Sequence, residues 1–133
     1  MRVLSPIFED FGVDVVFSGH CHFYERSYPL KFKLKVGKAG QKFNPDGKMV
    51  LDKGFDGITN RKPNGVIYIV SGAGGLLVSH DMRPETHGLM ESCYKIGDRK
   101  NSFTVIELDG KTLLLRQIDT DNEEVDRFSI EKE

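Results

Sequence analysis

Apolar and polar residues follow patterns that predict one helix near the start of the chain, followed by strands. Residues 3–11 carry apolar side chains at helical spacing, and Ser5 followed by Pro6 fits a helix cap with proline in the first turn. Gly12 is expected to end this helix. Residues 13–17 form a valine-rich run that predicts a short buried strand. Helix and strand together predict an αβ unit of a sheet covered on both faces.

Two further runs in the middle of the chain are typical of strands. Residues 31–36 alternate between lysine and apolar residues, which predicts a half-buried strand with a lysine face toward solvent. Residues 66–70 are mostly apolar and predict a buried strand. The side chains expected to point inward from the first of these strands are Phe32, Leu34 and Val36.

Two longer polar stretches predict irregular structure. Residues 37–65 are rich in Gly, Lys, Asp and Asn, and their turn signals predict a long loop or insertion. Such a loop could cover a functional cleft, or it could be an ordinary surface excursion with a small hairpin through residues 49–51. Residues 76–99 are also expected to be irregular, with Cys93 and Tyr94 anchoring them to the core.

The last third of the chain predicts a β-meander. Strands are expected at residues 103–108, 113–118 and 125–130, with turns at residues 109–110 and 121–122. At 133 residues the chain fits a single domain. The whole pattern predicts an α+β fold, with one N-terminal helix, a buried strand and then mostly antiparallel β structure.

Composition narrows the class of protein by exclusion. The net charge of −1 and the pI of about 6.4 give no support for binding to nucleic acid or to an anionic membrane. No apolar run approaches the ~20 residues of a membrane span. The apolar fraction of 38% fits a loop-rich domain or one that expects a partner surface. Cys21 and Cys93 allow one disulfide or two thiols, and two buried thiols are expected because a disulfide scaffold would need more cysteines.

The candidate chemistry begins where the strand predicted at residues 13–17 ends. His20 and His22 are separated by one residue, and in an extended backbone such side chains point the same way. Gly19 precedes them and would let the backbone turn sharply. Two neutral imidazoles on one side of a strand end make half of a metal site. The alternative is a surface pair or a hydrogen-bonded pair, because short motifs of this kind also arise by chance.

Two other groups of residues could take part in a site. The strand predicted at residues 66–70 runs into a glycine-rich turn, whose amides at Gly74 and Gly75 could hold an oxyanion. The alternative is that these glycines allow close packing of the backbone. His80 and His87 lie in a polar stretch and could reach a metal or a substrate, or could be exposed or hydrogen-bonded side chains.

Residues 19–26 read Gly-His-Cys-His-Phe-Tyr-Glu-Arg, which resembles the last motif of the calcineurin-like metallophosphoesterases. The run is most similar to the purple acid phosphatase branch, where Tyr-Glu-Arg follows the histidine pair. Residues 66–75 resemble the strand and glycine-rich turn that come next in these enzymes, and residues 102–111 resemble their closing strands. The resemblance covers most of the chain in pieces, of which only the first is specific.

This resemblance implies an α/β/β/α sandwich, of which this chain would supply the C-terminal half. It implies two metal ions, drawn from Fe, Zn and Mn, with His20 on one ion and His22 on the other. Phosphate monoesters would be hydrolysed by a metal-bound hydroxide. Tyr24 and Arg26 would support the ligands or approach the phosphate, although Arg26 could instead form a salt bridge that holds the segment in place. The resemblance also points to a secreted or periplasmic location.

The other motifs of this family are absent from the sequence. The family builds its site from an Asp, then Gly-Asp, Gly-Asn-His, a further His and finally Gly-His-x-His, of which only the last is present. The dipeptide Gly97-Asp98 follows the histidine pair instead of preceding it, so we interpret it as a turn. Residues 1–133 are therefore interpreted as the C-terminal portion of a metallophosphoesterase domain. We expect this portion to need the missing N-terminal half as a partner and to be inactive alone.

Other classes of protein also use closely spaced histidines. A cupin-like barrel would need a glycine where Asp14 stands, and a metallo-β-lactamase-like hydrolase would need an aspartate where Tyr24 stands. A structural β-rich module without metal stays open, and so does a non-catalytic module with one zinc ion. In the zinc module, His20 and His22 would be completed by His80, His87 or Cys93.

Overall fold

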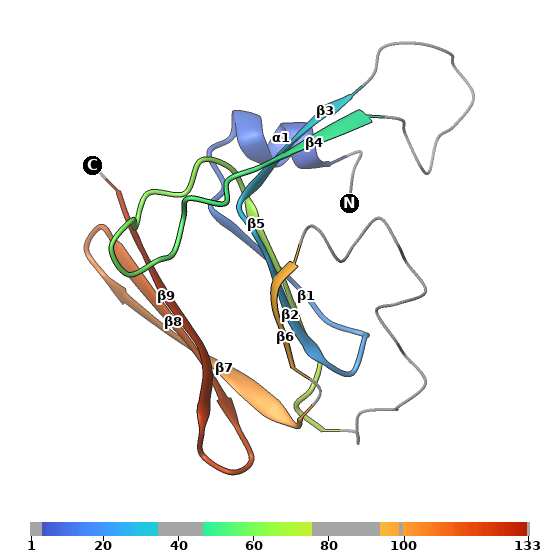
Figure 1. Cartoon of the computed structure of the whole chain (residues 1–133), viewed down its shortest axis with the longest axis vertical. Helices are drawn as coiled ribbons and strands as arrows, with labels where there is room; N and C mark the ends of the chain where they lie inside the picture. Colours follow the sequence, from blue (N-terminus) through green and yellow to red (C-terminus); the bar gives the residue numbers. More distant parts are fainter. Residues whose placement is uncertain (1–3, 35–46, 76–93, 99, 133) are drawn as a thin grey trace.

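The structure is a computed structural model that describes residues 4–34, 47–75, 94–98 and 100–132. One short helix precedes strands that are mostly antiparallel, so the fold is α+β as the sequence predicts (Figure 1). No helix among the described residues is long and apolar enough to cross a membrane. The elements are α1 (Ser5–Asp10), β1 (Val15–Ser18), β2 (Tyr24–Ser27), β3 (Leu30–Leu34), β4 (Gly47–Leu51), β5 (Ile67–Ser71), β6 (Tyr94–Asp98), β7 (Ser102–Asp109), β8 (Thr112–Asp119) and β9 (Glu124–Glu131).

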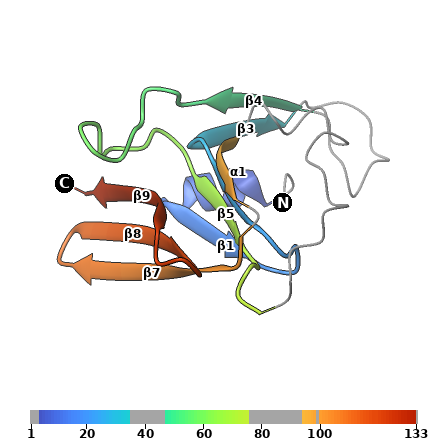
Figure 2. The same ribbon diagram turned by 60° about the horizontal axis from the view of Figure 1, so that its bottom comes forward.

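The described strands form three sheets. The first sheet has the order β1-β5-β2-β6, in which β1 pairs parallel with β5 and the other neighbours are antiparallel. The second sheet is the antiparallel pair β3-β4, and the third is the meander β7-β8-β9. Figures 1 and 2 show the meander and the first sheet as separate layers of the molecule. The meander confirms the strands predicted for the last third of the chain and both of its turns, although the first turn lies at residues 110–111, one residue later than predicted.

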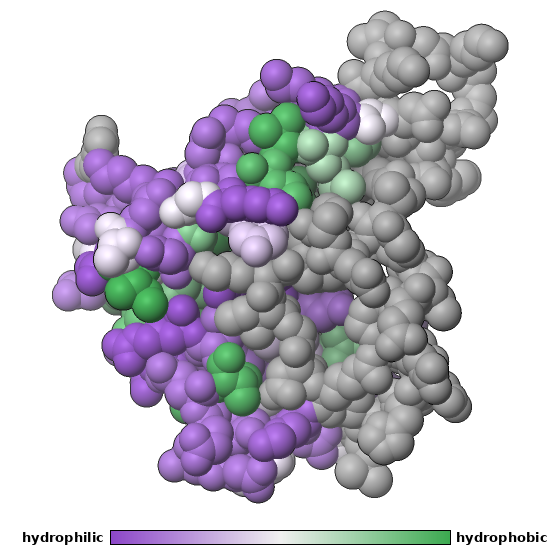
Figure 3. Space-filling view, in the orientation of Figure 1, coloured by the Kyte–Doolittle hydropathy of each residue, from purple (hydrophilic) through white to green (hydrophobic). Residues whose placement is uncertain are grey.

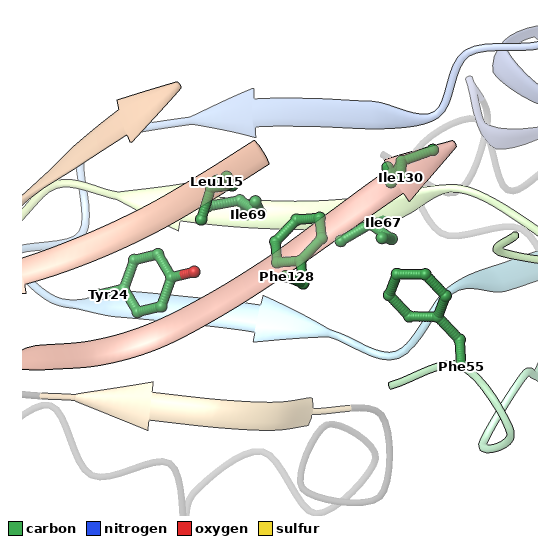
Figure 4. Packing of buried hydrophobic residues seen from close by; sticks show 7 residues of the cluster. All are labelled: Tyr24, Phe55, Ile67, Ile69, Leu115, Phe128 and Ile130. Carbon is green, nitrogen blue, oxygen red and sulfur yellow. The ribbon is translucent and has the colours of Figure 1, made fainter. Parts of the chain in front are cut away.

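One hydrophobic cluster joins these two sheets. Its side chains come from β2 and β5 of the first sheet and from β8 and β9 of the meander, with Phe55 added from the segment after β4 (Figure 4). Each large apolar side chain that is fully buried in this way stabilises the fold by about 1.5–3 kcal/mol. The two sheets are therefore held face to face by one core. Its members are Tyr24, Phe55, Ile67, Ile69, Leu115, Phe128 and Ile130.

The helix is shorter than the apolar spacing predicts, and it begins differently. Helix α1 starts at Ser5, and the capping position is Leu4, which makes no side-chain hydrogen bond to the helix. The prediction that Ser5 caps the helix is therefore wrong. The buried Ser5 hydroxyl instead accepts a hydrogen bond from Tyr68 at 2.8 Å, which ties the helix to β5. Gly12 follows the helix end with φ +65°, a conformation that favours glycine, as predicted.

Strand β1 differs from the prediction of a buried strand in a sheet covered on both faces. Among the described strands, β1 lies at the outer edge of its sheet, and its residues are half-buried or exposed. Strand β5, by contrast, has a neighbour on each side, and its Ile67 and Ile69 are fully buried. The valine-rich pattern of residues 13–17 identified a strand correctly but could not show how many neighbours that strand has.

The core side of the sandwich is uncovered along β1 and β7. Phe17 pairs with Ile69 and therefore faces the core side of the first sheet, yet it is 42% exposed. Ile106 pairs with the buried Leu115 and is 44% exposed, and Leu108, two residues further along the same face, is 76% exposed. We call the side formed by Phe17, Ile106 and Leu108 the open side. The coloured part of the face seen in Figure 3 is mostly hydrophilic, with a few separate apolar patches.

The stretch predicted as a long loop contains a strand. Strand β4 pairs in register with β3, at the place where a small hairpin was the alternative. Phe32 of β3 is buried as predicted, whereas the side chain of Leu34 and the whole of Val36 lie outside the described residues. The connection after β4 has no strand of its own, but it places Phe55 in the core.

This connection packs on β9. The backbone of Gly57 accepts a hydrogen bond from the Ser129 amide at 2.8 Å, and Arg61 accepts one from the Glu131 amide at 3.0 Å. Gly57 has φ +73°, and a side chain there would collide with Phe128. Residues 52–65 therefore lie at the end of the sheets away from the turn between β1 and β2, as both ribbon views show (Figures 1 and 2).

The dipeptide that we interpret as a turn lies in a strand. Gly97 and Asp98 are the last residues of β6, where they pair with Glu25 and Tyr24 of β2. The interpretation as a turn was wrong because a Gly-Asp pair is also compatible with the end of a strand. The irregular structure expected for residues 76–99 is likewise wrong at residues 94–98, and residues 76–93 lie outside the described part.

Candidate functional site

The histidine pair lies at one end of the parallel strand pair. Strand β1 ends at Ser18, level with Val70 of β5, and β2 begins at Tyr24, level with Ser71. The segment between them, residues 19–23, therefore crosses over the carboxyl ends of β1 and β5. Ligands of sheets with parallel strands commonly bind beyond these carboxyl ends. The position predicted for the two histidines relative to the sheet is therefore confirmed.

The backbone of this segment is tightly turned and not extended. The Cys21 amide donates a hydrogen bond to the carbonyl of Gly19 at 3.0 Å, and the Phe23 amide donates to that of Cys21 at 2.9 Å. His20 has φ +73°, a conformation that non-glycine residues adopt uncommonly. The prediction of an extended backbone, from which the two histidines would point the same way, is therefore wrong. His20 is exposed and His22 is half-buried.

A glycine of the neighbouring strand end fixes this turn. Gly72 donates its amide hydrogen to the carbonyl of Phe23 at 3.1 Å. A Cβ at position 72 would collide with the carbonyl oxygen of Cys21. By contrast, a Cβ at Gly19 would meet nothing within 4 Å. The position in this region that has no room for a side chain is therefore Gly72 and not Gly19.

The described residues form no complete metal site around His20 and His22. Within the described part of the chain, no group of three or more His, Cys, Asp or Glu side chains could hold a metal ion. His80, His87 and Cys93, the residues considered for completing a site, lie outside this part. Cys21 is a free thiol, as predicted. Imidazole is a suitable donor for Zn, Fe or Mn, but two imidazoles are half of the usual set.

Tyr24 and Arg26 follow the histidines and converge on one carboxylate. The Tyr24 hydroxyl donates to Oδ2 of Asp126 at 2.6 Å. The Arg26 guanidinium donates through Nε to Oδ2 at 2.6 Å and through Nη2 to Oδ1 at 2.7 Å. The Arg26 carbon Cζ also lies 4.6 Å from the centre of the Phe128 ring, within the range of a cation–π contact. The salt bridge considered as the alternative for Arg26 is therefore present.

The polar cluster formed by Tyr24, Arg26 and Asp126 lies inside the sandwich. Arg26 and Asp126 have side chains that are each 1% exposed, and Tyr24 belongs to the core shown in Figure 4. Burial, followed by the charge of Asp126, raises the pKa of Tyr24 well above its usual value. Tyr24 is therefore neutral at physiological pH and acts as a donor. Among the described residues, Arg26 Nη1 is a buried nitrogen without a hydrogen-bond partner.

A second chain of hydrogen bonds, which is partly buried, joins β5 to the meander near the same end. Thr104 donates to the Gln117 carbonyl, so Ser71 is the donor in the 2.8 Å contact between the two hydroxyls. The Gln117 amide donates in turn to the Ser102 hydroxyl at 2.8 Å. This chain and Asp126 were missed from sequence, because a polar residue inside an alternating strand gives no signal of its distant partner. The candidate glycines Gly74 and Gly75 come just after β5 and are exposed.

Comparison with known proteins places the fold but not the activity. No protein-family model matches the sequence, and no curated protein matches it. Among solved structures, the chain is similar to a purple acid phosphatase isolated from yellow lupin (Lupinus luteus) seeds, with a TM-score of 0.63 and 21% sequence identity. The match covers 96% of this chain and 19% of that one, so this chain spans less than a fifth of the lupin protein. The chain is thus an α+β fold related to one part of a purple acid phosphatase structure.

Proposed function

We propose that this chain is part of a dinuclear-metal phosphoesterase that hydrolyses phosphate monoesters, and that it is inactive alone. The observation that carries the proposal is the position of His20 and His22 at the carboxyl ends of β1 and β5, on a fold similar to part of a purple acid phosphatase. In the proposed enzyme each histidine is a ligand to one ion. The ions, drawn from Fe, Zn and Mn, would neutralise the phosphoryl oxygens and activate the attacking water.

The remaining ligands are proposed to come from outside this chain. A metal pair of this kind needs a bridging carboxylate, and the described residues contain no group of three or more His, Cys, Asp or Glu side chains that could hold a metal ion. The sequence also lacks the Gly-Asn-His run that carries further ligands in the family that it resembles. No catalytic step can therefore be assigned to this chain by itself. Its proposed contribution is to supply two imidazoles and to hold them at a defined place.

The residues around the histidines are proposed to support them and to approach the substrate. Tyr24 and Arg26 are occupied by Asp126, so their proposed role is to hold the segment and not to contact the phosphate. Gly74 and Gly75 are exposed at the end of β5, next to Gly72, which contacts the histidine segment. Their amides are the proposed contacts for the phosphoryl oxygens, because backbone amides in glycine-rich turns bind anions.

The open side is the proposed contact with the rest of the enzyme. Phe17, Ile106 and Leu108 face the core side of their sheets and yet are exposed. An apolar surface of this kind usually marks a contact with another protein segment. We propose that the N-terminal half of the same domain covers it. This would place the missing ligands beside β1, whose end carries the histidine segment.

Metal binding by the full chain tests the ligand assignment. Zinc would be added to labelled protein while the imidazole nitrogen resonances of all four histidines are followed by NMR. We expect His20 and His22 to shift together, and His20→Ala or His22→Ala to weaken binding by about tenfold or more. His80→Ala and His87→Ala are matched controls that should bind as the parent chain does. Loss of binding in these controls would instead support a site with a single zinc ion.

A hydrolysis assay tests the proposal that the chain is inactive alone. The chain alone, with Zn, Fe or Mn, is expected to give no turnover of 4-nitrophenyl phosphate above the rate in the metal solution. Turnover that His20→Ala abolishes would show that the chain is already a complete enzyme and would overturn that part of the proposal. Expression together with the polypeptide encoded upstream is the corresponding positive experiment, and it should give turnover that depends on both histidines.

A further inference from the structure

We propose that Asp126 is a positioning residue for the histidine pair. Its carboxylate, on β9, fixes the start of β2 and thereby the segment that carries His20 and His22. The consequence for metal binding rests on the function proposed above, whereas the structural consequence rests on the contacts alone.

The Asp126 carboxylate receives three hydrogen bonds from β2. They come from the Tyr24 hydroxyl at 2.6 Å and from two nitrogens of Arg26 at 2.6 Å and 2.7 Å. The paired contact with the guanidinium fixes its orientation as well as its distance. Because Tyr24 and Arg26 are alternate residues of one strand, the carboxylate holds both the position and the rotation of β2.

The histidine segment has little length with which to absorb a movement of β2. Tyr24 is separated from His22 by a single residue, Phe23, whose carbonyl accepts the hydrogen bond from Gly72. At the other end, the segment leaves β1, which is paired to β5 through Ser18. A shift of Tyr24 is therefore transmitted directly to His22.

The cluster is better suited to positioning than to net stabilisation. Moving a carboxylate and a guanidinium out of water costs free energy that largely offsets their attraction, so apolar residues of similar size often stabilise a fold equally well. Apolar side chains in the same space would still pack the two sheets together. They would not provide the directional contacts that fix β2. This difference makes positioning and packing separable by experiment.

The test compares three variants of the full chain. Asp126→Asn keeps the size of the side chain and removes its charge. The triple variant Tyr24→Phe, Arg26→Met, Asp126→Leu replaces the whole cluster by apolar side chains. Asp119→Asn is the matched control, because Asp119 is also a buried carboxylate paired with a cation, Lys100, but is the last residue of β8, where it binds the turn to β9.

Hydrogen exchange is the readout that does not require metal. The amides of Cys21, Phe23 and Gly72 form the hydrogen bonds of the histidine segment, and their exchange would be compared with that of the slowest core amides. We expect exchange at the segment to rise about tenfold relative to the core in Asp126→Asn and in the triple variant. Asp119→Asn should show no such difference. Equal behaviour of Asp126→Asn and the control would overturn the proposal.

Zinc binding is the second readout. We expect Asp126→Asn to bind zinc at His20 and His22 about tenfold more weakly than Asp119→Asn does. If the parent chain shows no zinc-dependent change at these histidines, the proposed function fails, while hydrogen exchange still decides the role of Asp126. If Asp126→Asn does not fold, Tyr24→Phe takes its place. It removes one of the three hydrogen bonds and should give a smaller increase in exchange, and no increase would overturn the proposal.

Discussion

Gly72 shows how a single backbone position can shape the candidate site. Its amide holds the carbonyl of Phe23, and the space where a side chain would begin is filled by the carbonyl of Cys21. Backbone atoms on both sides leave no flexible group that could move aside. The turn that carries the histidines therefore depends on a glycine that directly follows another strand, β5.

Replacing Gly72 by alanine should destabilise the fold, whereas the same change at Gly75 should not. We expect Gly72→Ala to lower the free energy of unfolding by about 1–3 kcal/mol, because the new methyl group forces the two backbones apart. Urea unfolding followed by circular dichroism would measure the change. Gly75→Ala is the control, since nothing lies within 4 Å of its Cβ, and its effect should stay within about 0.5 kcal/mol. Equal effects of the two changes would contradict the structure.

Tyr24 should make the fold sensitive to alkaline pH. Its pKa is raised in the folded chain, so above about pH 10 the unfolded chain releases a proton that the folded chain keeps. This contribution to stability is fully present below pH 10 and is lost as the pH rises, by about 1.4 kcal/mol for each pH unit. Tyr24→Phe should reduce the slope of the free energy of unfolding against pH. The remaining slope is due to Tyr68, whose pKa is also raised by burial. An unchanged slope in Tyr24→Phe would contradict the assignment.

The turn between β8 and β9 is an element built around one carboxylate. Asp119 accepts hydrogen bonds from the backbone amides of Asp121 and Glu123 and pairs with Lys100 at 2.9 Å. Lys100, followed by the amide of Glu123, holds the pKa of Asp119 below its usual value. The same carboxylate raises the pKa of Lys100. The hairpin is thus closed by a carboxyl group that must stay ionised.

Acid should therefore weaken this turn. A carboxyl whose folded pKa is lowered contributes stability above its unfolded pKa of about 4, and that contribution is lost as the pH falls further. We expect the free energy of unfolding to decrease below pH 4, and to decrease less in Asp119→Asn, measured by urea unfolding at several pH values. Asp121→Asn is the control, because Asp121 is an exposed partner of Lys100, and exposed pairs contribute little. A steeper acid dependence in Asp119→Asn would contradict this account.

The elements were predictable where the pattern is local. Helix spacing located α1, the run of apolar residues located β5, and the two turns located the meander. The number of neighbours of β1 was not predictable, because a valine-rich run has the same appearance in an inner strand and in an outer one. The histidine pair was found by its spacing, but its turned backbone depends on Gly72. Asp126 was not found, because its partners Tyr24 and Arg26 lie about a hundred residues away and no pattern links them.

The molecule as a whole is closed on one side and open on the other. The core joins the first sheet to the meander, and residues 52–65 cover the end of β9. Phe17 of β1 and both Ile106 and Leu108 of β7 face the core side and stay exposed. A layered domain normally buries such residues against another layer or segment. The open side is therefore where the molecule should be most prone to associate.

Charges placed on the open side should suppress this association. We expect the double variant Ile106→Lys and Leu108→Lys to bind less anilinonaphthalene sulfonate and to sediment as a smaller species than the parent chain. Stability should change little, because both side chains are already largely exposed. Ile58→Lys is the matched control, since Ile58 is 64% exposed but lies in the connection after β4. Equal dye binding in all three proteins would show that the open side is not an association surface.

The left-handed backbone at His20 has a consequence for anyone who redesigns this chain. Glycine adopts that conformation more readily than histidine does. A search for heat-resistant variants would therefore tend to select glycine at position 20. The thermostable variant so obtained would lack the imidazole at position 20, so screening for heat resistance alone would remove a group on which the proposed chemistry depends.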